Sequence, residues 1–147
     1  MEQKFIDVLE KGELKMWLDI STYCNAGCPA CHRTDRISGG LHHEKWLPMI
    51  QWNIDQIKNA YPVSFLKQIS AWEICGTFGD PVMNKDLYEI CEYISTNSDT
   101  KINIDTNGSI RSTAWWSKLG KLSGVEVDFA VEGTTPEMQN YYRRKTD

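Results

Sequence analysis

The hydrophobic positions of the chain follow two periodicities. Leu14, Met16, Leu18 and Ile20 lie two residues apart, which is typical of a β-strand with one buried face. The apolar residues of 85–95 recur instead every three or four positions, the spacing of one face of an α-helix. The sequence therefore predicts a chain that mixes strands and helices.

Along the whole chain, these periodicities predict an N-terminal helix followed by four strand–helix units. The expected strands are 14–20, 69–75, 101–105 and 125–131, and the expected helices are 2–11, 41–58, 85–95, 113–122 and 136–144. Strands that alternate with helices favour right-handed crossovers and a parallel sheet. The expected fold class is α/β, with about four parallel βα units in a partial, TIM-like (β/α) barrel.

A loop with glycine or polar residues follows each expected strand. These loops are 21–36, 76–81, 106–108 and 130–133. Active sites of parallel α/β sheets lie beyond the carboxyl ends of the strands. We therefore expect the four loops to meet at one rim and to form the functional site there.

The loop 21–36 carries a cysteine motif, Cys24-x3-Cys28-x2-Cys31. Thiolates suit iron–sulfur clusters and zinc. A [4Fe–4S] cluster ordinarily takes four cysteines, so three leave one iron open to a small molecule. A structural zinc site takes four protein ligands, and the neighbouring His32 or a remote cysteine is a candidate for the fourth. The residues alone leave both metals open.

Composition and charge exclude several classes of protein. The chain has 147 residues and a formal net charge of −4, which argues against a protein held on nucleic acid by bulk electrostatics. No apolar run approaches the ~20 residues of a membrane span, and the charged N-terminus does not resemble a signal peptide. Five cysteines, three of them crowded together, do not suggest a disulfide framework. We expect one soluble, cytoplasmic domain.

The cysteine motif, placed directly after the first strand, resembles that of the radical S-adenosylmethionine (radical SAM) enzymes. In that family, three cysteines at this spacing hold a [4Fe–4S] cluster whose open iron binds SAM. One electron from the cluster cleaves SAM to methionine and a 5′-deoxyadenosyl radical, which abstracts hydrogen from a substrate. The resemblance implies that Cys24, Cys28 and Cys31 are the cluster ligands.

The other three loops resemble further motifs of that family. Residues 76–81, Gly-Thr-Phe-Gly-Asp-Pro, are similar to its Gly-Gly-Glu-Pro loop, whose backbone holds the methionyl amine of SAM. Residues 106–108 are similar to its Thr-Asn-Gly turn, and 129–133 with 142–144 resemble its Ser-Ile-Asp-Gly … Tyr-Arg segment. The SAM-binding residues that the resemblance implies are Gly76, Gly79, Asp80, Asn107 and Glu132.

The resemblance implies a radical SAM enzyme that receives electrons from a donor such as flavodoxin or ferredoxin. The cysteine loop is similar to that of the branch that modifies peptides or activates other enzymes. The family core is usually longer than this chain, so we expect 1–147 to be a truncated core, which a partner chain or an oligomer completes. The alternatives are a non-catalytic remnant that binds a cluster or a partner, and a zinc-binding cysteine module.

Overall fold

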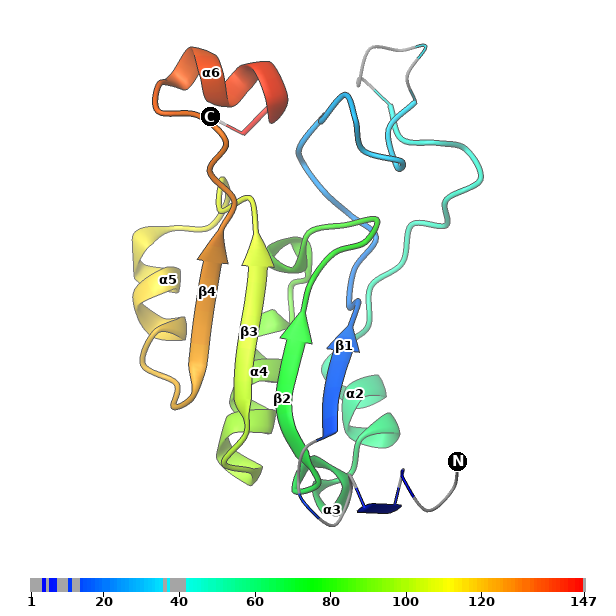
Figure 1. Cartoon of the computed structure of the whole chain (residues 1–147), viewed down its shortest axis with the longest axis vertical. Helices are drawn as coiled ribbons and strands as arrows, with labels where there is room; N and C mark the ends of the chain where they lie inside the picture. Colours follow the sequence, from blue (N-terminus) through cyan, green and yellow to red (C-terminus); the bar gives the residue numbers. More distant parts are fainter. Residues whose placement is uncertain are drawn as a thin grey trace.

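The structure is a computed structural model that describes Lys4, Ile6, Asp7, Lys11 and residues 14–35, 37 and 42–146. Its sheet has four strands, β1 (Leu14–Leu18), β2 (Ile69–Ile74), β3 (Lys101–Thr106) and β4 (Val125–Phe129). Each strand pairs in parallel with the next one in the chain, in the order β1-β2-β3-β4 (Figure 1). The predicted α/β fold with four parallel strands of a partial barrel is therefore confirmed.

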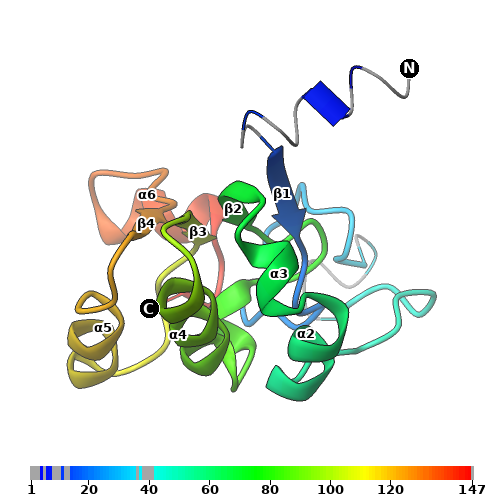
Figure 2. The same cartoon turned by 90° about the horizontal axis from the view of Figure 1, so that it is seen from below.

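The helices lie on one face of this sheet and at its two ends. They are α2 (Ile54–Ala60), α3 (Val63–Leu66), α4 (Leu87–Asn97), α5 (Thr113–Leu119) and α6 (Pro136–Tyr142), with a short 3-10 turn, η1 (Pro81–Met83). Figures 1 and 2 show α2, α4 and α5 on the same face of the strands, and α6 beyond the carboxyl end of β4. No helix of the described part is long and apolar enough to cross a membrane.

The hydrophobic core lies between the strands and these helices. Period-two alternation sends one set of strand side chains toward the helices, and these side chains are buried. The core includes Leu18, Trp72, Ile74, Ile102 and Ile104 from the strands and Ile57, Ile90, Ile94 and Leu119 from the helices. Each buried side chain of this size stabilises the fold by about 1.5–3 kcal/mol, so the sheet holds the loops at its rim on a rigid base.

The predicted helix 41–58 is wrong over most of its length, because α2 begins only at Ile54. Asn53 caps that helix: its side chain accepts a hydrogen bond from the backbone N–H of Gln56, and the Gln56 side chain accepts from the Asn53 N–H. Pro48, which has no backbone N–H, also disfavours a helix through the preceding segment. The expected helix 2–11 falls mostly outside the described residues.

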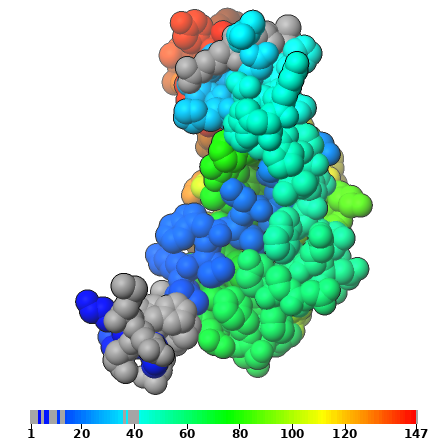
Figure 3. Space-filling model, turned by 90° about the vertical axis from the view of Figure 1, so that its right-hand side faces the viewer, coloured from blue at the N-terminus to red at the C-terminus, as the bar shows by residue number. Residues whose placement is uncertain are grey.

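Residues 42–52 run beside the cysteine loop instead. The backbone N–H of Thr22 donates to the carbonyl of Ile50 at 3.0 Å, and that of Trp52 donates to the carbonyl of Ile20 at 3.0 Å. Figure 3 shows this segment, in cyan, on the flank between the cysteine loop and the helices below it. Backbone groups of 42–52 therefore form hydrogen bonds with residues distant in the sequence, which hydrophobic periodicity does not reveal.

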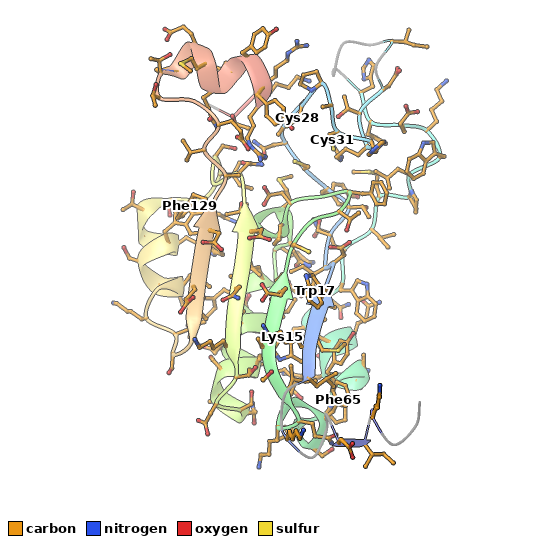
Figure 4. The ribbon with its side chains drawn as sticks, viewed as in Figure 1. Lys15, Trp17, Cys28, Cys31, Phe65 and Phe129 are labelled. Carbon is orange, nitrogen blue, oxygen red and sulfur yellow. The ribbon has the colours of Figure 1, made fainter. Side chains whose placement is uncertain are left out.

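The face of the sheet opposite the helices is polar, and we call it the open face. It carries Lys15, Trp17, Asp19, Glu73, Cys75, Asn103, Asp105, Glu126 and Asp128. Figure 4 labels Lys15 and Trp17 on β1, and the Trp17 side chain is 69% exposed. Partial burial and the carboxylates of Asp128 and Glu73 raise the pKa of Asp105 above its usual range.

The substitution Asp128→Asn is expected to lower the pKa of Asp105, because it removes a neighbouring negative charge. Carboxyl-carbon NMR titration measures this pKa. The folded-state pKa lies above the unfolded one, so ionising Asp105 costs stability as the pH rises through that range, and Asp128→Asn relieves part of this cost at higher pH. Glu126→Gln is the control, since Glu126 does not contribute to the shift. An Asp105 pKa that moves equally in both variants would contradict the pairing with Asp128.

Candidate functional site

The cysteine loop begins where β1 ends and lies above the carboxyl ends of the strands. Figure 4 shows Cys28 and Cys31 there, near α6. Backbone hydrogen bonds fix the loop on both sides: the N–H of Asp80 donates to the carbonyl of Tyr23 at 2.7 Å, and the N–H of Gly27 donates to the carbonyl of Arg144 at 2.8 Å. The loop is thus held between the segment after β2 and the end of α6.

The three cysteines of the motif line one cavity of about 240 Å³. Its other walls are Ala26, Ala30, Arg33, Gly76, Gly79, Asp80, Tyr142 and Arg143. A second cavity of about 200 Å³ shares Gly76, Gly79, Asp80 and Arg143 with the first and adds Asn107 among others. The structure therefore brings together all the predicted site residues except Glu132, which lines neither cavity.

The cavity is lined by three thiols, the kind of ligand that holds iron–sulfur clusters. Among the described residues, no three His, Cys, Asp or Glu side chains lie close enough together to hold a single metal ion. The cavity offers three soft thiols, the carboxylate of Asp80 and no histidine, and soft thiols suit iron–sulfur clusters and zinc. Burial raises the pKa of Cys24 to about 11 and also raises that of Cys28, so both thiols must lose protons when they bind a metal.

Gly79 allows the loop 76–81 to lie against the cysteine loop, and Gly76 allows that loop to fold tightly on itself. A Cβ on Gly79 would stand 1.9 Å from the carbonyl oxygen of Ser21, and a Cβ on Gly76 would stand 2.0 Å from the carbonyl oxygen of Gly79. Both neighbours are backbone atoms, which cannot rotate away as a side chain can. The glycines are therefore needed for packing, whatever they contact in a ligand.

The carboxylate of Asp80 joins three segments of the rim. It is 4% exposed, and one oxygen accepts from the Thr106 hydroxyl at 2.7 Å and from the Val82 N–H at 3.1 Å. The other oxygen accepts from the Asn107 N–H at 2.8 Å. Asp80 thus caps η1 and ties the loop after β2 to the turn after β3, which is a structural role beside its predicted contact with SAM.

Replacing Asp80 by asparagine is expected to lower the free energy of unfolding by about 2 kcal/mol, because the amide has one acceptor oxygen in place of two. Either Asn107 N–H or the Thr106 and Val82 donors then lose their partner. Urea unfolding of the two proteins measures the difference. Asp86→Asn is the comparison, since Asp86 is only partly buried. Equal losses of unfolding free energy in the two variants would contradict the prediction that the buried hydrogen bonds of Asp80 contribute more to stability than those of Asp86.

Glu132 reaches the site through Arg143. The guanidinium of Arg143 donates to both carboxylate oxygens of Glu132, and this hydrogen-bonded pairing raises the pKa of Arg143. Arg143 was not among the site residues predicted from the sequence, although it lies in the segment 142–144 that resembles the Tyr-Arg motif. The structure places it in the walls of both cavities.

Arg33 was also missed by the sequence analysis. Its side chain is buried, with 7% exposed, and donates to the backbone carbonyls of Phe78 at 2.9 Å, Thr22 at 3.3 Å and Cys24 at 3.5 Å. It therefore joins the cysteine loop to the loop after β2 and places a positive charge beside Cys24. Nothing in its sequence position, two residues after the motif, distinguishes it from a solvated arginine.

A larger cavity lies elsewhere and lacks this chemistry. It measures about 740 Å³ and is lined by Lys67, Ile69, Ser70 and residues 95–100, at the opposite end of the sheet. It contains no cysteine and no histidine. The smaller cavities at the cysteine loop are therefore the candidate functional site, because of the side chains that line them and not because of their size.

The comparisons with known proteins agree with the fold. The sequence matches no family model and no curated protein. Among solved structures, the chain resembles BtrN, a radical SAM enzyme solved in complex with AdoMet and 2-DOIA, with a TM-score of 0.58 and 16% sequence identity. The match covers 77% of this chain and 43% of the BtrN chain, so it spans less than half of BtrN. The likeness shows that the chain has a radical SAM-like fold.

Proposed function

We propose that this chain is a radical SAM protein that holds a [4Fe–4S] cluster on its cysteine loop and SAM in the adjoining cavity. The observation that carries the proposal is the single cavity lined by Cys24, Cys28, Cys31 and the 76–81 loop, at the carboxyl end of a radical SAM-like sheet. BtrN, which has this fold, was crystallised with AdoMet, another name for SAM.

The three thiolates would bind three irons of the cluster and leave the fourth open, as three protein ligands require. When bound, the cluster supplies one electron that cleaves SAM and yields a 5′-deoxyadenosyl radical for hydrogen abstraction. Arg33 stabilises the negative charge of the Cys24 thiolate, since its positive charge lowers the pKa of Cys24 against the effect of burial. No protein base is needed for the hydrogen abstraction.

The residues that line both cavities form the proposed SAM site, together with Asn107 in the second cavity. The partly buried backbone of Gly76 and Gly79 lines both cavities and would provide hydrogen-bonding groups for the methionyl end, and Asp80 fixes the neighbouring backbone in place. The guanidinium of Arg143 complements the charge and the shape of a carboxylate, and it is paired with the carboxylate of Glu132. In this proposal Glu132 orients Arg143, and Asn107 lines the cavity beside it.

The substrate and the partners remain predictions from the resemblance. We propose a peptide or a protein as the substrate class, in line with the peptide-modifying and enzyme-activating branch. A flavodoxin or ferredoxin is the proposed electron donor, and a partner chain or a second copy would complete the barrel.

Anaerobic reconstitution with iron and sulfide, followed by reduction and electron paramagnetic resonance (EPR), tests the proposal. A [4Fe–4S] signal that changes when SAM is added supports both the open iron and the SAM site. A cluster whose signal ignores SAM would contradict the SAM site. A protein that binds zinc and takes up neither iron nor sulfide would overturn the proposal in favour of a zinc-binding module.

A further inference from the structure

The side-chain amide of Asn107 has a defined orientation. Its Oδ1 accepts hydrogen bonds from the backbone N–H of Ser109 at 3.0 Å and from the Ser109 hydroxyl at 2.6 Å. An amide turned by 180° would present its NH₂ group to the Ser109 N–H, donor against donor. The hydrogen-bond network therefore fixes Oδ1 toward Ser109 and Nδ2 toward the cysteine loop.

The Nδ2 group of Asn107 faces the first cysteine of the motif. It lies 3.7 Å from Sγ of Cys24 and 3.2 Å from Oδ1 of Asn25. Its two hydrogens can serve both acceptors at once, and 3.7 Å is within reach of a sulfur acceptor, which is larger than oxygen. The amide thus places the positive end of its dipole at the sulfur.

The backbone around Asn107 holds it in this position from below. Its N–H donates to the buried carboxylate of Asp80, whose other oxygen accepts from Thr106. The Gly108 N–H donates to the Thr106 hydroxyl at 3.1 Å. These bonds belong to the turn after β3, so the donor reaches Cys24 from a rigid element outside the cysteine loop.

A donor of this kind has a known physical effect on a cluster ligand. Reduction adds negative charge that spreads onto the sulfurs, and an N–H group aimed at a sulfur stabilises that charge. The reduced state is therefore favoured, and the reduction potential rises. The effect is larger where the sulfur is screened from water, and the Cys24 side chain is partly buried.

We propose that Asn107 is a positioning residue that donates a hydrogen bond to the Cys24 sulfur and thereby raises the reduction potential of the cluster. This inference rests on the proposed function, because it needs a cluster on Cys24, Cys28 and Cys31. It adds to that function a residue outside the cysteine motif that sets how readily the cluster takes up an electron.

Two variants of Asn107 and one of Ser109 test the inference in the full chain. Asn107→Leu removes the donor without adding charge, and Asn107→Asp removes it while keeping an acceptor for Ser109. Ser109→Ala disturbs the turn but leaves the Asn107 donor in place. The readout is the midpoint potential of the reconstituted cluster in an anaerobic redox titration followed by visible absorbance and EPR.

We expect the ratio of reduced to oxidised cluster at a fixed potential to fall about tenfold in Asn107→Leu, which corresponds to about 59 mV for one electron. The fall is expected to be larger in Asn107→Asp, because the new carboxylate repels the added charge. Ser109→Ala is expected to keep the wild-type potential. The iron content of each variant confirms that fully loaded clusters are compared.

Three outcomes would overturn the inference. Equal potentials in the wild type and in both Asn107 variants, with clusters fully loaded, would contradict it and leave the proposed function standing. A shift in Ser109→Ala as large as that in Asn107→Leu would show that the geometry of the turn, and not the donor, sets the potential. A wild-type chain that takes up no cluster would overturn the inference and the proposed function together.

Discussion

Replacing Cys24, Cys28 or Cys31 by serine, one at a time, is expected to abolish the iron–sulfur absorbance and the EPR signal of the reconstituted protein. The iron bound per chain is expected to fall at least tenfold, because even the loss of a residue that only supports a metal ligand lowers metal affinity by about 10- to 100-fold. A serine hydroxyl does not ionise near neutral pH and is a hard ligand, whereas iron–sulfur clusters are held by thiolates. Each of the three variants is expected to have the same effect, because all three sulfurs line one cavity.

Cys75→Ser is the matched control for these variants. Cys75 lies outside the motif, donates to a carboxylate oxygen of Asp19 at 3.7 Å, and lines only the second cavity. Burial and the charge of Asp19 raise its thiol pKa to about 11, which disfavours the thiolate that a metal needs. The control is expected to keep its cluster. Loss of the cluster in Cys75→Ser would mean that Cys75 is a fourth ligand, and no iron would then be open to SAM.

The strands could be predicted because their signal is local. Leu14, Met16 and Leu18 alternate within one segment, and Ile102 and Ile104 repeat this spacing on β3. The segment 42–52 could not be predicted in this way. Its apolar residues carry a helical spacing, but its backbone bonds to the cysteine loop more than twenty residues away in the sequence. Long-range hydrogen bonds of this kind override local periodicity.

The residues of the candidate site also divide into those with a local sequence signal and those that depend on long-range contacts. The three cysteines form a local motif, so their shared cavity could be expected from the sequence. Arg33 and Arg143 become site residues only through distant partners, the carbonyl of Phe78 for one and the carboxylate of Glu132 for the other. A resemblance to Tyr-Arg was visible around Arg143, but an arginine near a helix end also has a simpler explanation in the helix dipole.

The substitution Gly79→Ala is expected to lower the free energy of unfolding by about 3–5 kcal/mol, at the upper end of what an overpacked buried position costs. The new Cβ would stand 1.9 Å from the carbonyl oxygen of Ser21 and 2.9 Å from Cα of Thr22. Since neither atom belongs to a flexible side chain, one of the two loops must shift. The midpoint of thermal unfolding is expected to fall by roughly 10 °C or more in a chain of this size.

Gly120→Ala is the matched control, because it makes the same chemical change where there is room. Gly120 ends α5 with right-handed helical angles, φ −66° and ψ −3°, and a Cβ there would have its nearest neighbour, the carbonyl oxygen of Trp116, at 3.5 Å. This variant is expected to be unchanged or to gain up to about 1 kcal/mol, since alanine restricts the unfolded chain. Equal stability of the two variants would mean that the loops are not packed as closely as the structure has them.

The Gly79→Ala variant also tests whether the packing of the two loops affects cluster loading when all three cysteine ligands are present. Its loop is tied to the cysteine loop by the bond from the Asp80 N–H to the Tyr23 carbonyl and by the bond from Arg33 to the Phe78 carbonyl. A shift of either loop strains both bonds and moves Cys24 relative to the turn that holds Asn107. We therefore expect Gly79→Ala to lower cluster loading at temperatures where the variant is still folded, although no ligand is removed. Full loading with a wild-type potential in folded Gly79→Ala would show that the cysteine loop positions its sulfurs without support from the loop after β2.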